Sequence, residues 1–205
     1  MPSRTAERAG RLFVVSAPSG AGKTTLCRLL REAFPDLAYS VSATTRPPRK
    51  GEMDGVDYHF VDVETFRDGI AGGRWAEWAE VHGNYYGTPA AFLEDCRRKG
   101  IDVLMDIDVK GALQILSRFP DAVTVFIMPP SLEVLRERLT GRGSEPDANL
   151  AVRLDNAQWE MDQRHRYRHV IVNDRLETAA QELRRLVAAY RDPDTTAGGA
   201  EGMAP

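Results

Sequence analysis

The most restrictive feature of this chain is an apolar segment that runs into a glycine-containing loop and then into an amphipathic segment. Residues 12–15 are Leu-Phe-Val-Val, the composition of a buried strand. A loop of small residues follows over 16–22, and apolar residues then recur at helical spacing from Leu26 to Ala33. We therefore expect a strand, a loop and a helix in that order, which is typical of α/β proteins with a mainly parallel sheet.

The loop has the chemistry of a phosphate-binding site. Its two glycines allow successive N–H groups to turn toward one anion, and the helix N-terminus adds partial positive charge there. The lysine and threonine that follow can contact terminal phosphates and ligate Mg²⁺, respectively. The usual first glycine of the motif is Ala17 here, but the flanking strand and helix favour a phosphate site over an ordinary turn. The expected nucleotide-binding residues are Ala17, Pro18, Ser19, Gly20, Ala21, Gly22, Lys23, Thr24 and Thr25.

Length and composition limit the class of protein. A chain of 205 residues can form one substantial core with small insertions. No stretch is long and apolar enough to cross a bilayer, and residues 1–10 lack the apolar core of a secretion signal. The net charge of −3 gives no electrostatic case for binding nucleic acid or an anionic membrane. With two cysteines, Cys27 and Cys96, and no metal-ligand spacing of histidines, we expect a cytoplasmic protein.

The rest of the chain alternates between strand and helix patterns, apart from one inserted region. Further strands are expected near 39–41, 101–108, 122–128 and 169–172, and further helices near 89–99, 110–119, 131–139, 147–165 and 177–190. Residues 42–88 are polar with scattered proline and glycine, so they form an expected insertion. Within it, residues 64–80 are expected to be partly helical and residues 83–88 to form a turn-rich loop.

Ligands bind at the carboxyl ends of the strands in parallel sheets, which predicts where the polar residues of this chain meet. The loop at 16–23, the acidic residues at 106–108 and Asn173 each follow an expected strand. We therefore expect these three segments, distant in sequence, to line one crevice.

The inserted region contains two groups with recognisable chemistry. Arg46 and Arg49 lie three residues apart, close in sequence to Tyr58, and arginine forks match phosphate oxygens, with a solvated basic turn as the alternative. Guanine presents donors at N1 and N2, and one carboxylate can accept both. Glu77 is a candidate for that carboxylate, although a single glutamate is more often a surface residue. Adenine has an acceptor at N1, so such a site would discriminate against it.

These residues belong to longer patterns, S-x-T-T-R-P-P-R-x-G-E-x-x-G-x-D-Y over 42–58 and E-W-A-E-V-H-G-N-Y-Y-G-T over 77–88. The chain also has D-I-D at 106–108, R-L-x-G-R-G at 138–143 and V-I-V-N-D at 170–174. Over residues 10–190 it thereby resembles the bacterial guanylate kinases. The resemblance implies a P-loop nucleoside-monophosphate-kinase-like fold. It also implies transfer of the ATP γ-phosphoryl group to GMP, with Mg²⁺ as cofactor, in purine nucleotide metabolism.

The resemblance also implies roles for individual residues. GMP is expected to contact Ser42, Arg46, Arg49, Tyr58, Glu77, Tyr86, Thr88 and Asp108. The ATP site is expected to include Asn173 besides the loop, and Mg²⁺ is expected near Thr24 and Asp106. The residues expected to stabilise the transferred phosphoryl group are Lys23, Arg46, Arg138, Arg142 and Arg153. Lys110 stands where the family usually has glutamine, and we expect its side chain to point outward.

The expected organisation is one core with two mobile lobes. The core comprises 10–41, 89–130 and 156–191, the GMP-binding lobe 42–88 and the lid 131–155, with loose tails at 1–9 and 192–205. Two other functions remain open, namely a peptide-binding scaffold of the same fold and a kinase for ribose bisphosphates. Lys23 and Thr24 argue against the scaffold, and Glu77 argues against the ribose bisphosphate kinase. The sequence does not indicate an oligomeric state.

Overall fold

The structure, a computed structural model, describes residues 8–81, 83–140 and 147–192. Its central layer is a parallel five-stranded sheet in the order β2-β7-β1-β8-β9. These strands are β1 (Leu12–Ser16), β2 (Ala38–Tyr39), β7 (Val103–Asp106), β8 (Val123–Met128) and β9 (His169–Val172). The expected α/β class with a parallel sheet is therefore confirmed.

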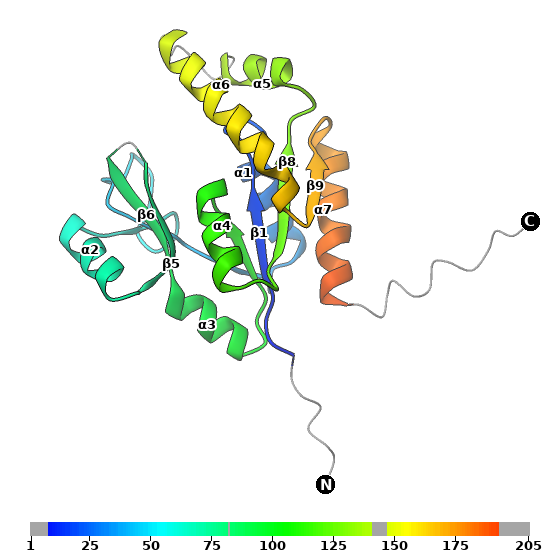
Figure 1. Cartoon of the computed structure of the whole chain (residues 1–205). Coiled ribbons are helices and arrows are strands. Elements are labelled where there is room, and N and C mark those ends of the chain that lie inside the picture. The colour runs from blue at the N-terminus through cyan, green and yellow to red at the C-terminus, as the bar shows by residue number, and fades with distance from the viewer. Residues whose placement is uncertain (1–7, 82, 141–146, 193–205) are drawn as a thin grey trace, which may run out of the picture.

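Helices cover both faces of this sheet, which explains the continuous apolar run of β1 (Figure 1). The helices beside the sheet are α1 (Lys23–Ala33), α3 (Ala90–Arg98), α4 (Val109–Arg118) and α7 (Leu176–Arg191). Phe13 and Val15 pack in the core cluster that includes α1 and α7 residues. Leu12 and Val14 point the other way, into the cluster that includes α3 and α4 residues. All five residues of β1 are buried, so the strand fixes the loop that follows it.

A second, four-stranded sheet has the order β4-β3-β6-β5 and lies beside α4, at the left in Figure 1. Its strands are β3 (Ala43–Thr44), β4 (His59–Phe60), β5 (Trp75–Val81) and β6 (Asn84–Pro89), and α2 (Val63–Ala71) accompanies them. The expectation that 64–80 is partly helical is confirmed, because α2 ends at Ala71, and strand β5 begins at Trp75. The expected loop at 83–88 was wrong, because Asn84–Pro89 form strand β6.

Aromatic packing across the second sheet explains why β5 and β6 form strands. The Phe66 ring of α2 stacks on Trp75 of β5 with centroids 4.3 Å apart and on Tyr85 of β6 at 5.3 Å. Trp75 Nε1 also donates to the Phe66 carbonyl at 3.0 Å. Pairing of β5 with β6 brings Trp75 and Tyr85 together on the fully buried Phe66 ring. Tertiary contacts thus outweigh the local turn signal of Gly87, whereas Gly83, with φ of +75°, forms a turn directly before β6.

Two further helices lie above the carboxyl ends of β1 and β8 (Figure 1). They are α5 (Leu132–Thr140) and α6 (Asp147–Asp162), and a 3-10 turn, η1 (Gln163–Arg166), follows α6. The expected N-cap of α5 is confirmed, because the Val134 N–H donates to Ser131 Oγ at 3.2 Å. Within the described residues, no helix has the length and apolarity needed to span a bilayer.

Candidate active site

The loop between β1 and α1 is held in shape by a residue from the far edge of the sheet. Gly20 and Gly22 adopt φ of +91° and +94°, a region that favours glycine. Asn173, directly after β9, donates from Nδ2 to the Ala21 carbonyl at 2.8 Å. A Cβ on Gly22 would lie 2.4 Å from that Nδ2 atom. Glycine at this position therefore permits both the turn and the close approach of Asn173.

Lys23, the first residue of α1, faces the carboxyl end of β7. Its Nζ lies 2.6 Å from Asp106 Oδ1 and donates to the Ile107 carbonyl at 3.0 Å. Burial lowers the pKa of Lys23, but the charge and hydrogen bond of Asp106 raise it more, so the net pKa is raised. The ammonium therefore stays charged. These contacts confirm that 16–23, 106–108 and Asn173 meet, although Asn173 contacts the loop and does not line the crevice itself.

Asp108 ends the same segment and begins α4. Its Oδ1 accepts the Gly111 N–H at 2.7 Å, which caps the helix, and its carbonyl accepts from Ser16 Oγ at 3.4 Å. Asp108 therefore caps the helix and also lines the crevice, because it belongs to both pockets described next. Lys110, two residues on, is exposed as expected, with Nζ 5.9 Å from the Trp159 ring centroid.

Two adjoining pockets occupy the crevice. The smaller, about 290 Å³, is lined by residues of the loop together with Asp108 and Glu160. The larger, about 780 Å³, extends between the two sheets and is lined by residues of α1, β7 and the second sheet. The residues that line both pockets are Ser19, Lys23, Thr24 and Asp108. Two ligands in these pockets would therefore meet beside the Lys23 ammonium.

One end of the larger pocket is basic and aromatic. Arg46 forms a two-pronged pair with Glu52, with Nη1–Oε2 and Nη2–Oε1 distances of 3.0 and 2.9 Å. Its guanidinium also lies 5.5 Å from the Tyr58 ring centroid, and that ring lies 6.0 Å from the Tyr86 ring. The predicted cluster of Arg46, Arg49, Tyr58 and Tyr86 is thus brought together on one pocket wall.

Glu52 is a functional residue that the sequence reasoning missed. Besides pairing with Arg46, its Oε2 accepts the Arg49 backbone N–H at 2.7 Å. It therefore orients both arginine-bearing segments of the turn. The available signal was the glutamate of the R-P-P-R-x-G-E pattern, six residues after Arg46 and three after Arg49.

The other end of the larger pocket holds a buried carboxylate. Glu77 on β5 pairs with Thr88 on β6, and Thr88 Oγ1 donates to Glu77 Oε1 at 2.7 Å. A Cβ on Gly111 would lie 2.6 Å from Glu77 Oε2, so the N-terminal turn of α4 closes tightly on the carboxylate. Burial raises the pKa of Glu77 to about 7, although the Thr88 hydrogen bond opposes the rise. Ser42 lines the same pocket, whereas the Thr88 hydroxyl supports Glu77 from behind the pocket wall.

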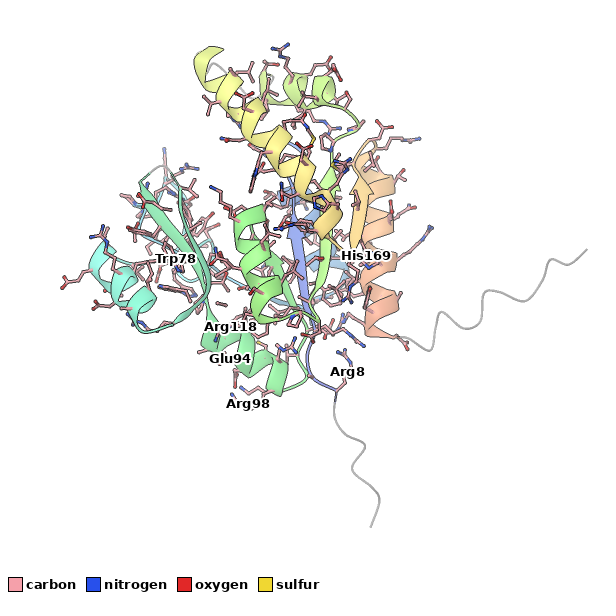
Figure 2. All side chains as sticks on the ribbon, viewed as in Figure 1. Arg8, Trp78, Glu94, Arg98, Arg118 and His169 are labelled. Carbon is pink, nitrogen blue, oxygen red and sulfur yellow. The ribbon has the colours of Figure 1, made fainter. Side chains whose placement is uncertain are left out.

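A second contact fixes β5 against α4. Trp78 lies on the second sheet across from α4 (Figure 2), where Gln114 bonds both of its backbone polar groups. Gln114 Oε1 accepts the Trp78 N–H at 3.1 Å, and Gln114 Nε2 donates to the Trp78 carbonyl at 2.8 Å. The strand that carries Glu77 is therefore anchored next to the helix that Asp108 caps.

The arginines expected in the lid contact the phosphate loop and its support. Arg153 Nη2 donates to Ser19 Oγ at 2.9 Å, and Arg138 Nη2 donates to the Asn173 carbonyl at 3.0 Å. Arg142 lies outside the described residues. The Asn173 side chain, expected in the ATP site, is turned toward Ala21 and lines neither pocket. In this arrangement the Asn173 side chain stabilises the phosphate loop through its hydrogen bond to the Ala21 carbonyl.

Glu160 on α6 was also missed. It lines the smaller pocket together with the phosphate loop. Burial, followed by the nearby charge of Asp108, raises its pKa to about 7. The signal for it was its spacing, because seven residues after Arg153 is two helical turns and places both side chains on one face of α6.

Comparison with known proteins agrees with the fold. The family model for guanylate kinase matches residues 9–190. A guanylate kinase of Geobacter metallireducens is 49% identical over 185 residues, covering 90% of this chain and 91% of the relative. One of Syntrophotalea carbinolica is 51% identical over 183 residues, covering 89% and 87%. The crystal structure of guanylate kinase from Anaplasma phagocytophilum matches with a TM-score of 0.71 and 37% identity, covering 89% of this chain and 86% of that one. The chain therefore belongs to the guanylate kinase family.

Proposed function

We propose that the two pockets divide the substrates of the guanylate kinase reaction, in which GMP and ATP give GDP and ADP. The larger pocket holds GMP, and the smaller pocket holds the ATP phosphates. The shared wall supports this division, because Lys23 and Thr24 line both pockets where the transferred phosphoryl group would pass. The volume of about 780 Å³ suits a mononucleotide.

The observation that carries the choice of GMP is the buried Glu77 carboxylate. Thr88 donates to this carboxylate, but burial still makes its charge costly. The N1 and N2 donors of guanine would satisfy the carboxylate and stabilise its charged form. Adenine would set the N1 lone pair against it, a mismatch that can cost roughly 10⁴ in specificity. A ribose bisphosphate would leave it unpaired.

The opposite end of the pocket suits the GMP phosphate. Arg46 and Arg49 supply guanidinium donors, and Tyr58 and Tyr86 supply phenolic hydroxyls on the same wall. The phosphate oxygen would attack the ATP γ-phosphorus in line, with no covalent enzyme intermediate. Lys23 would neutralise charge on the transferred group throughout.

The residues near Lys23 also fit Mg²⁺. The Thr24 hydroxyl and the Asp106 carboxylate line the larger pocket, and hard oxygen donors of this kind suit Mg²⁺. When bound, Mg²⁺ supplies positive charge to the β- and γ-phosphates. Asp106 would act from the outer shell, since its Oδ1 is paired with Lys23.

We also propose that two lobes of the protein close over the substrates. Residues 42–88 form the GMP-binding lobe, and residues 131–155 form the lid that delivers Arg138 and Arg153. Closure of both would exclude water, which otherwise competes as phosphoryl acceptor. Small-angle scattering with GMP and a non-hydrolysable ATP analogue should show a smaller radius of gyration than the free protein. We propose that the protein acts in purine nucleotide metabolism in the cytoplasm.

The test is the choice of acceptor. ADP formation from ATP and Mg²⁺ is measured with GMP, AMP, UMP, dTMP and ribose 1,5-bisphosphate in turn. We expect turnover with GMP and none with the other four. Turnover with ribose 1,5-bisphosphate would keep the phosphate loop and overturn the GMP assignment. Nucleotide binding without any turnover would favour a binding module.

A further inference from the structure

A buried hydroxyl in the wall of the larger pocket has no function in the scheme above. Ser40 is 5% exposed, and its Oγ has no hydrogen-bond partner among the described residues. Four other buried side-chain atoms in the described part of the chain share this condition, but among these residues only Ser40 lines either of the two pockets described above. An unpaired buried hydroxyl costs stability, so its presence at a binding site points to a ligand partner.

The position of Ser40 indicates which part of GMP it would meet. Ala38 packs in the core cluster that includes Ala76 and Val109, whereas Tyr39 packs in the opposite cluster. Alternation along the strand directs Ser40 toward the first of these faces, where β5 and α4 meet. Glu77 lies on β5 next to Ala76, and Asp108 is the N-cap residue of α4 next to Val109.

The backbone of Ser40 ties it to the core. Its N–H donates to the Leu104 carbonyl of β7 at 2.9 Å, whereas two residues later the Ser42 carbonyl accepts the His59 N–H of the second sheet. Residues 40–42 thus form one of the crossings between the two sheets. Ser40 therefore lies at the core-sheet wall of the pocket, and the alternation along β2 directs it toward β5 and α4, away from the turn that carries Arg46 and Arg49.

We propose that Ser40 is a further GMP-binding residue, whose hydroxyl forms a hydrogen bond with the base or ribose of the nucleotide. The inference rests on the assignment of GMP to the larger pocket. Ser40 therefore lowers the stability of the free protein and increases its affinity for GMP. A purely structural serine would contribute stability in both states.

The experiment compares Ser40→Ala and Ser40→Cys with wild type and with Ser42→Ala. Calorimetry measures the Kd of GMP and of a non-hydrolysable ATP analogue, and thermal unfolding without nucleotide measures Tm. We expect Ser40→Ala to weaken GMP binding by about three- to tenfold and to leave the Kd of the ATP analogue unchanged. Its Tm should be equal to or above that of wild type. The GMP affinity of Ser40→Cys should fall between those of wild type and Ser40→Ala, because a thiol is a weak hydrogen-bonding group.

Two analogues locate the partner group. IMP lacks the N2 amine of guanine, and dGMP lacks the ribose 2′-hydroxyl. If the Ser40→Ala loss disappears with IMP, the partner is the amine, and if it disappears with dGMP, the partner is the 2′-hydroxyl. A loss that persists with both analogues places the bond on another nucleoside atom and still supports the proposal.

Two outcomes would overturn it. Unchanged GMP affinity in Ser40→Ala, with a clear loss in Ser42→Ala, would leave the GMP pocket intact and remove Ser40 from it. A lower Tm together with weaker binding of both nucleotides would make the hydroxyl structural. If neither serine affects GMP binding, the assignment of GMP to this pocket fails with the proposal.

Discussion

The buried hydroxyl of Thr88 donates to the Glu77 carboxylate at 2.7 Å across the paired strands β5 and β6. Glu77 is 6% exposed and Thr88 is fully buried, so this hydrogen bond supports the carboxylate from within the protein. It opposes but does not offset the effect of burial, which raises the pKa of Glu77 to about 7. The charge of Glu77 therefore changes near neutral pH, where a ligand with two N–H donors selects the ionised form.

The affinity for GMP should depend on the ionisation of Glu77. As pH falls from 8 to 6, the carboxylate gains a proton and loses the acceptor that guanine needs, so the Kd of GMP should rise by several-fold. Glu77→Gln should bind GMP weakly and lack this component of the pH dependence. Calorimetry on wild type and Glu77→Gln separates the contribution of Glu77 from titration of the GMP phosphate, because the phosphate titrates in both experiments. Parallel pH profiles for the two proteins would contradict the role of Glu77.

The same group should make the free protein less stable at high pH. A carboxyl whose pKa rises from 4.5 to about 7 on folding favours the folded state when protonated, and this stabilisation is lost as pH rises through that range. Glu77→Gln should therefore gain free energy of unfolding relative to wild type between pH 5 and pH 8, on the order of 2 kcal/mol. Urea unfolding at both pH values measures the gain. A difference that is constant with pH would count against the raised pKa.

Removal of Asp106 should destabilise the phosphate loop. The Lys23 ammonium lies 2.6 Å from Asp106 Oδ1, and both side chains are largely buried. Asp106→Asn should lower the free energy of unfolding by about 1–3 kcal/mol, because it leaves the ammonium without its counter-charge. A double-mutant cycle with Lys23→Met isolates the pair, since the second change removes the charge that needs compensation. Strictly additive effects would show that the two residues do not interact.

Arg153 should be needed for turnover more than for stability. Its contact with Ser19 Oγ at 2.9 Å holds the guanidinium beside the phosphate loop. Arg153→Ala should reduce kcat by about 100- to 1,000-fold with little change in Tm, and Arg153→Lys should recover part of the loss. Arg136→Ala, an exposed arginine on α5, is the control and should retain wild-type kcat. Equal kcat values for the alanine variants would remove Arg153 from the transition state.

Asp102 should be the main electrostatic anchor at the opposite end of the core sheet. It accepts two hydrogen bonds from Arg8, each 2.8 Å, as well as the Arg11 N–H and Arg191 Nε. Arg8 lies at the foot of the sheet (Figure 2), and Arg191 also pairs with Asp36. Burial raises the pKa of Asp102, but these donors together lower it below 3.8. The stabilisation is therefore present at neutral pH and lost as pH falls through the folded pKa.

Asp102→Asn should thus lower the free energy of unfolding at pH 7 by about 2–4 kcal/mol while the KM values stay constant. The matched control is Asp121→Asn, which breaks a pair with Arg97 at an exposed carboxylate and should cost less than about 1 kcal/mol. Urea unfolding of both variants makes the comparison. Equal losses would show that burial of Asp102 adds nothing.

Features that depend on nearby residues could be predicted from the sequence. The strand, loop and helix around Gly20 and Gly22 follow from local apolar periodicity and turn chemistry. The Ser131 cap is equally local. The convergence of 106–108 and Asn173 on the loop could also be predicted, because it is a general property of parallel sheets.

Only the tertiary structure decided features that depend on which distant segments meet. Residues 75–81 became a strand because β6 pairs with them and Phe66 packs on the pair. The Asn173 side chain turned toward Ala21, and Glu160 reached the smaller pocket, through packing between segments more than a hundred residues apart. Periodicity and turn signals report on a few neighbouring residues, whereas strand pairing, burial and the pKa shifts that follow from burial depend on the whole assembled core.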